Sequence, residues 1–139
     1  MRRLAMAAAA SATLVTAATG FATPSTAVQP PSQSITDWTR VGCADLQGYT
    51  GARICLDYSP GTAGAARGIL FNDSQSAIPN KGIFVNLGSG ADVSCSQVVT
   101  PAGDRVQCVK TLNGRFALRL NYTKGSGAPD SVQTAAHTF

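Results

Sequence analysis

Four cysteines are the feature that most constrains what this chain can fold into. They stand at positions 43, 55, 95 and 108, and four cysteines allow three pairings. An even number of cysteines in a small chain with an export signal, described below, indicates disulfides. The spacing favours the pairs Cys43–Cys55 and Cys95–Cys108, because each pair brackets one predicted turn.

The turn between the second pair is the stronger signal. The midpoint of Cys95 and Cys108 falls between Pro101 and Ala102, where Pro occupies the second position of a predicted turn. A hairpin folded there sets the two cysteines directly opposite each other, at a separation that suits a disulfide. The midpoint of the first pair is Tyr49, in a glycine-flanked turn. Each bridge is expected to contribute about 3 kcal/mol in the chain-entropy model.

A zinc site is the alternative use of the cysteines. Structural zinc sites contain closely spaced pairs of ligands, and the four cysteines show no such spacing. The one histidine, His137, is third from the end of the sequence and is expected in an exposed tail. We therefore expect no metal and no cofactor.

The first 27 residues read as a secretory signal peptide. A basic start at Arg2 and Arg3 precedes an uncharged run rich in Ala, and small residues at 25 and 27 suit a cleavage site after Ala27. The run is too weakly apolar for a comfortable membrane anchor. We expect a secreted, extracellular protein without membrane insertion, in which residues 28–36 form a flexible lead-in and residues 37–139 a single β-domain.

The charge pattern excludes several classes of protein. Charged residues make up 13% of the chain, about half the usual share, which argues against a coiled coil. Without Arg2 and Arg3, nine basic side chains face seven acidic ones, a net charge of +2. This balance argues against a nucleic-acid partner and supports no general attraction to acidic partners. A local basic patch built from Arg105, Lys110, Arg115 and Arg119 is the alternative to a solvated sheet face.

Short runs of β-branched and aromatic residues, separated by Gly, Pro, Asn and Ser, predict an all-β fold. Seven or eight strands in about one hundred residues favour a small antiparallel β-sandwich, with a small β-barrel as the alternative. The predicted strands are 38–44, 52–58, 66–71, 83–87, 91–99, 105–112, 115–123 and 131–139.

Alternation along the strands predicts which side chains share a face. In the run 115–123 the apolar face consists of Phe116, Leu118, Leu120 and Tyr122. Asn113-Gly114 is a strong hairpin signal and places Cys108 opposite Arg119, on the polar face.

In the run 52–58, Ile54, Leu56 and Tyr58 share one face, while Arg53, Cys55 and Asp57 share the other. Both disulfides are thus predicted to be hairpin disulfides on the outer face of the sheet.

The residues offer little for catalysis. The seven aspartates are spread singly along the chain, and no nucleophile motif accompanies His137. We therefore expect no enzyme activity. A small hydrolase that uses paired aspartates is the third-ranked function.

A non-catalytic binding domain is the preferred function, with an extracellular protein or a glycan as its partner. Leu46, Gln47 and Tyr49 lie at the predicted tip of the Cys43–Cys55 loop and are candidate contact residues. Two further loops, 59–65 and 73–82, are long enough to carry function. Trp38 and Tyr58 are expected in the core.

A rigid-loop inhibitor of a secreted protease or other hydrolase is the alternative function. The disulfide would hold the loop in one conformation and so reduce the entropy lost on docking. Leu46 or Tyr49 would suit an apolar specificity pocket, and Arg53 a trypsin-like one.

Overall fold

The computed structural model describes residue 35 and residues 37–139, which form a two-sheet antiparallel β-sandwich. The predicted signal peptide and nearly all of the lead-in lie outside the described residues. The eight strands are β1 (Thr39–Asp45), β2 (Ala52–Tyr58), β3 (Ala65–Asn72), β4 (Ile78–Asn86), β5 (Val93–Thr100), β6 (Asp104–Thr111), β7 (Arg115–Thr123) and β8 (Pro129–Thr138).

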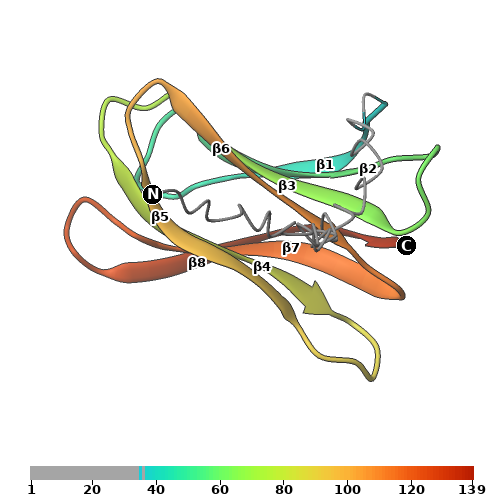
Figure 1. Ribbon diagram of the computed structural model, residues 1–139. Helices are drawn as coiled ribbons and strands as arrows, with labels where there is room; N and C mark the ends of the chain where they lie inside the picture. The colour runs from blue at the N-terminus through green and yellow to red at the C-terminus, as the bar shows by residue number, and fades with distance from the viewer. Residues whose placement is uncertain (1–34, 36) are drawn as a thin grey trace, which may run out of the picture. The chain divides into compact units, whose positions relative to one another are not determined.

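Each sheet has four strands. The first, sheet A, has the order β1-β2-β3-β6, and the second, sheet B, the order β5-β4-β7-β8. Figure 1 shows sheet A above sheet B, with β5 and β6 on one side of the pair. The all-β prediction and the existence of all eight strands are confirmed. Within the described residues no helix is long and apolar enough to cross a membrane.

The core lies between the sheets and follows the predicted alternation. The predicted apolar face of β7 is buried throughout, and Ile54 and Leu56 of β2 pack against it in the same cluster. The remaining large core side chains are Leu46, Tyr49, Leu70, Ile78, Phe84 and Leu112. Burial of these groups provides the main drive that holds the sheets face to face.

The predicted hairpin at Asn113-Gly114 is wrong. The strands on either side belong to different sheets, since β6 pairs with β3 and β7 pairs with β4 and β8. A two-residue hairpin of that type needs positive φ at both central residues, and only Gly114 has it. The backbone amide of Leu112 instead donates to Gly64, and the Leu112 side chain enters the core.

The Cys95–Cys108 bond forms as predicted, but its place in the fold differs. Cys95 lies on β5 in sheet B and Cys108 on β6 in sheet A, with 6.1 Å between their Cα atoms. Both cysteines pack against the core rather than on the outer face. Pro101 accepts a hydrogen bond from the Asp104 amide. The predicted turn therefore exists, and it carries the chain from one sheet to the other.

The Cys43–Cys55 bond is the hairpin disulfide that the spacing predicts. The two residues stand opposite each other in the β1–β2 ladder. Cys55 alternates with the core residues Ile54 and Leu56, which places it on the outer side of sheet A, although its exposed fraction is 0%. A side chain must therefore cover it, and Arg40 reaches the sulfur of Cys43.

The predicted loop 73–82 is shorter than expected, because β4 begins at Ile78. Pro79 and Gly82 argued for a loop. Pro79 lies within the β4–β5 ladder, opposite Val99, and Gly82 lies beside the sulfur of Cys95. Both residues fit the strand, one near its start and the other where a side chain has little room.

Replacing Cys95 and Cys108 by Ala is expected to lower the free energy of unfolding by about 3 kcal/mol. Because the bond joins the sheets, amide exchange should rise most in β5 and β6. The Cys43–Cys55 bond closes a loop of similar length and serves as the control. Replacing Cys43 and Cys55 by Ala should leave amide exchange in β5 at the level set by global stability. Equal exchange patterns for the two pairs, measured by NMR, would contradict the inter-sheet role.

Candidate functional site

The predicted contact loop at residues 46–51 is folded inward. Tyr49 is 6% exposed and Leu46 is 4% exposed. The Tyr49 hydroxyl donates to the carbonyl of Thr123 at 2.6 Å, and its ring meets Tyr122 edge to face. Of the three candidate contact residues, only Gln47 has an exposed side chain.

The position of the loop explains why Leu46 and Tyr49 are buried. The loop closes one end of the sandwich, where an exposed tyrosine ring would leave the core open to water. The carbonyl of Gln47 lies 3.1 Å from the Tyr122 hydroxyl, which ties the loop to sheet B a second time. Leu46 and Tyr49 therefore stabilise the fold and are not available to a partner.

A different surface gathers functional side chains, and we call it the arginine face. It is the outer side of sheet A, and its defining residues are Arg40, Arg53, Arg67, Phe71 and Arg105. In the ladders, Arg53 stands opposite Phe71 and Phe71 opposite Arg105. A second row runs from Arg40 through Asp57 to Arg67. Side chains on directly opposed residues project to the same side of a sheet, so these rows form one surface.

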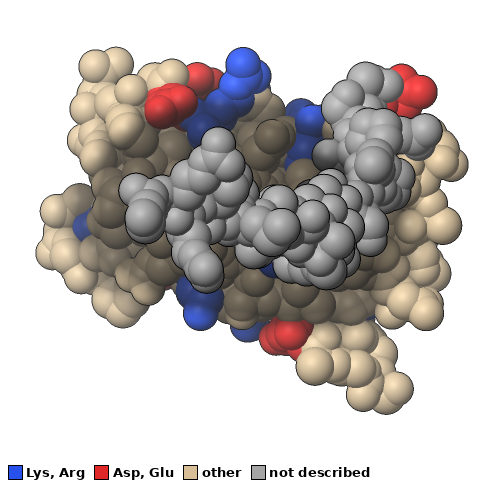
Figure 2. All heavy atoms as spheres, in the orientation of Figure 1, with Lys and Arg blue, Asp and Glu red and all other residues tan. Residues whose placement is uncertain are grey.

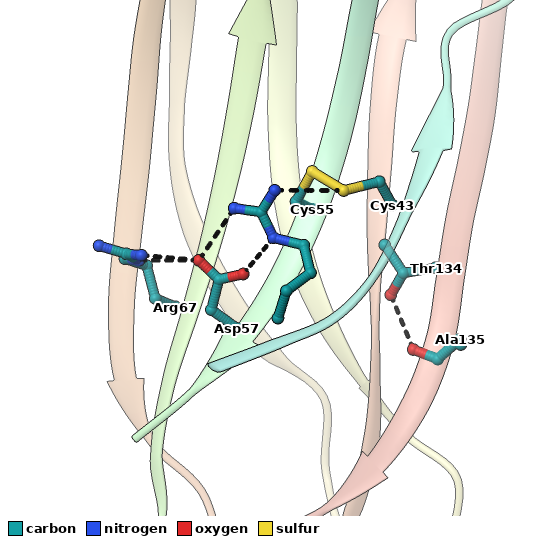
Figure 3. The surroundings of a disulfide bond; sticks show 7 residues. Cys43, Cys55, Asp57, Arg67, Thr134 and Ala135 are labelled. Carbon is teal, nitrogen blue, oxygen red and sulfur yellow. Dashed lines mark hydrogen bonds and ion pairs between the residues drawn. A yellow bond between two sulfur atoms is a disulfide. The ribbon is translucent and has the colours of Figure 1, made fainter. Parts of the chain in front are cut away.

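Asp57 holds the second row together. Its side chain is 2% exposed, and it forms ion pairs with both Arg40 and Arg67. Figure 3 shows Arg67 directed at the Asp57 carboxylate. Nε of Arg40 lies 2.6 Å from one carboxylate oxygen, and Nη2 of Arg67 lies 2.7 Å from the other. One buried carboxylate thus fixes two guanidinium groups through charge-assisted hydrogen bonds.

Aromatic rings support the same arginines. The guanidinium carbons of Arg40 and Arg53 lie 5.6 Å and 5.1 Å from the centre of the Phe71 ring. That of Arg67 lies 4.5 Å from the Trp38 ring. These distances fit cation–π contacts. The expectation that Trp38 lies in the core is wrong, because it is half-buried beside β3 and donates to the carbonyl of Ile35.

Arg105 completes the face at its edge strand. It is exposed, and within the described residues it makes no ion pair. Arg40, Arg67, Phe71 and Arg105 surround a shallow hollow. Figure 2, in the orientation of Figure 1, shows basic side chains projecting upward from the region of sheet A, beside acidic ones.

The basic patch of Arg105, Lys110, Arg115 and Arg119, which the sequence offered as the alternative to a solvated sheet face, does not form. Arg105 lies on the outer side of sheet A, whereas Arg115 and Arg119 lie on β7 of sheet B, on the side opposite Phe116, Leu118 and Leu120. Lys110 lines the space between the sheets. The sequence did not predict the arginine face, because its two rows form only when β3 pairs with both β2 and β6. The sequence did indicate that Arg53 and Asp57 share the outward face of their strand, which was the one available sign of this surface.

A polar cluster joins the ends of β7 and β8. The Tyr122 hydroxyl lies 3.1 Å from Asp130, and the Lys124 ammonium lies 2.8 Å from the same carboxylate oxygen. Burial, followed by the hydrogen bond to Asp130, raises the pKa of Tyr122 above its usual range. The hydrogen bond from Lys124 is the main cause that lowers the pKa of Asp130. These shifts favour a neutral tyrosine and an ionised aspartate, which is the pairing that holds the ends of β7 and β8 together.

The other residues considered from the sequence, namely His137, Tyr58 and several aspartates, contact neighbouring side chains in the fold. His137 is not in an exposed tail, because it lies in β8 and stacks on Tyr58 at 4.2 Å between ring centres. The expectation for Tyr58 is met only in part, since it is half-buried and outside the core cluster. Asp57, Asp92 and Asp130 each pair with a basic side chain. Within residue 35 and residues 37–139, no cluster of three His, Cys, Asp or Glu side chains could hold a metal ion.

Comparison of the chain with protein-family models, with curated proteins and with solved structures finds no match.

Replacing Asp57 by Asn is expected to lower the free energy of unfolding by about 2–3 kcal/mol. The change leaves Arg40 and Arg67 without their shared countercharge, and breaking a buried ion pair on one side is costly. Partial exposure of Arg40 reduces the cost. The control is Asp45→Asn, an exposed carboxylate on the same face, which should change stability by less than about 0.5 kcal/mol. Equal effects in urea denaturation would contradict the central role of Asp57.

Replacing Tyr49 by Phe is expected to cost about 1 kcal/mol of stability, because the Thr123 carbonyl loses its donor. Gln47→Ala removes an exposed side chain from the same loop and should stay within about 0.5 kcal/mol of wild type. Thermal unfolding measures both changes. A Tyr49→Phe protein as stable as wild type would show that the loop is not fastened by this bond.

Proposed function

We propose that this protein is a secreted, non-catalytic binding protein whose arginine face binds an anionic polysaccharide. The observation that carries the proposal is the arrangement of four arginines in two cross-strand rows on one side of a sheet. They outnumber Asp45 and Asp57, the carboxylates in the same two rows. The excess positive charge is local, which explains why the net charge of the chain does not reveal it.

The spread of the charges favours a polymer over a small anion. Neighbouring strands lie about 4.8 Å apart, so the face extends about 14 Å across four strands and about 13 Å along them. A single small anion reaches only part of such a surface, whereas a chain with repeated carboxylate or sulfate groups can contact several arginines at once.

The chemistry of the side chains favours acidic groups with paired oxygens. A guanidinium group presents parallel N–H donors that match carboxylate and sulfate. Arg53 and Arg105 have no carboxylate partner within 4.0 Å in the part of the chain that the structure describes, so their donors are free to bind. Arg40 and Arg67 are held in position by Asp57. The face thus combines fixed and available cations.

An extracellular glycan suits the rest of the molecule. Two disulfides fit a protein outside the reducing cytoplasm, where anionic polysaccharides are available as partners. The inhibitor alternative has less support. Leu46 and Tyr49 are buried and cannot enter a protease pocket, and Arg53 lies inside β2, paired on both sides, and not on a protruding loop.

The test is titration calorimetry with dextran sulfate as the anionic probe and uncharged dextran as its neutral counterpart. Wild-type protein should bind dextran sulfate, more weakly as salt is added, and should not bind dextran. Replacing both Arg53 and Arg105 by Gln should weaken binding about tenfold, since each exposed charge contributes up to about 1 kcal/mol. These two arginines are not tied to Asp57, so the fold should be preserved.

The matched control removes the same two charges from sheet B, with Lys81→Gln and Arg115→Gln. Lys81 alternates with buried residues of β4, and Arg115 precedes buried Phe116 on β7. Affinity for dextran sulfate should stay within about twofold of wild type. If both double variants lost affinity equally, the binding would depend on net charge alone and the assignment to the arginine face would fail.

A further inference from the structure

We infer that the space between the sheets beside the Cys95–Cys108 bond is a second binding site, for a small and mainly apolar molecule with one hydroxyl or N–H donor. This inference is independent of the arginine face, because it concerns the inner side of sheet A. The space has a volume of about 270 Å³. A cavity of about 150 Å³ already accommodates a benzene ring, so the size fits a molecule of two fused rings.

The cavity is lined by apolar side chains from both sheets, together with polar groups. Leu70 and Val106 belong to sheet A, and Val98, Leu118 and Leu120 belong to sheet B. Val98 and Val106 are only half-buried although they face the core side. When an apolar ligand covers apolar groups that remain accessible within a concavity, the burial of their surface favours binding.

Two glycines determine how closely the cavity wall packs on this side. Gly68 on β3 stands opposite Cys108 in the ladder, and a Cβ there would lie 2.9 Å from Leu118. A Cβ on Gly82 of β4 would lie 3.3 Å from the sulfur of Cys95. The absence of both side chains lets Leu118 and the disulfide approach the backbone. It also leaves no large side chain from these two positions to fill the gap between the sheets.

The other side of the sandwich has a different construction. There β1 lies against β8, and a Cβ added to Gly42 of β1 would make ordinary contact with Ala135 at 3.5 Å. The small residues Gly42 and Ala135 let the strands close directly on each other. The cavity is thus confined to the side on which β5 and β6 are joined by the disulfide.

One polar side chain in the lining indicates a donor on the ligand. Asn80 is 4% exposed, and its Nδ2 donates to the Ile78 carbonyl and to the Thr100 hydroxyl. Both amide hydrogens are therefore used, and the described hydrogen bonds leave the Oδ1 atom to accept from a ligand. An accessible acceptor in the lining favours a molecule with a hydroxyl or N–H group over a pure hydrocarbon.

The disulfide limits the occupant to a small molecule. It holds the Cα atoms of Cys95 and Cys108 6.1 Å apart, whereas sheets that pack face to face lie about 10 Å apart. An extended peptide cannot pass between β5 and β6 at that point. A compact ligand can enter beside the bond, where Lys110 is also part of the lining.

The experiment uses 2-naphthol, a neutral two-ring probe with one hydroxyl group, and follows its fluorescence on titration with the protein. Wild type should bind with a dissociation constant of about 0.1 mM or tighter, as expected for a ligand of this size. Val106→Phe fills the cavity and should weaken binding at least tenfold. Val99→Phe places the same ring on the exposed outer side of β5 and should bind like wild type.

A second measurement does not depend on any variant. In the NMR spectrum of the wild-type protein, 2-naphthol should shift the amides of Gly68, Gly82 and Cys108 and leave those of Arg53 and Phe71 in place. Val106→Phe should keep its affinity for dextran sulfate, which separates this site from the arginine face. No binding at about 1 mM 2-naphthol, equal binding by the two Phe variants, or shifts confined to the outer faces would each overturn the inference.

Discussion

The covalent bond between Cys95 and Cys108 is the constraint on which the relation of the two sheets depends. It joins strands of different sheets at an edge where Val93 and Val106 are only partly buried. Core burial alone favours association of the sheets, but it does not fix a half-open edge. With that edge fixed, sheet A becomes a rigid support whose outer side chains keep their relative positions, and the cavity beside the bond keeps its shape.

A second constraint, the buried carboxylate of Asp57, organises what the rigid sheet presents. Two arginines on either side of one carboxylate would repel each other without it, and with it they become fixed parts of the surface. Arg53 and Arg105 stay without such a partner in the described part of the chain. The same sheet therefore carries cations that stabilise the fold and cations that are free for an acidic partner. This division is the physical basis of the proposed binding function.

The sequence allowed the strands and their faces to be predicted, because alternation is a local property. The buried faces of β2 and β7 and both cysteine pairings follow from spacing alone. The strand partners could not be predicted, since the turns at Pro101 and Gly114 resemble hairpins locally, whereas they lead between sheets. For the same reason Tyr49 was assigned to an exposed tip, although it closes the core. The arginine face depends on β3 lying between β2 and β6, which no local pattern encodes.

The central claim is that the outer side of sheet A is the surface that recognises an acidic polymer. The most direct measurement is a titration of isotope-labelled protein with dextran sulfate, followed by the amide and arginine side-chain resonances. The account predicts that the shifts concentrate on the outward residues of β2, β3 and β6, with the largest changes at Arg53 and Arg105. Shifts concentrated on β7 and β8, or spread evenly over both sheets, would contradict it.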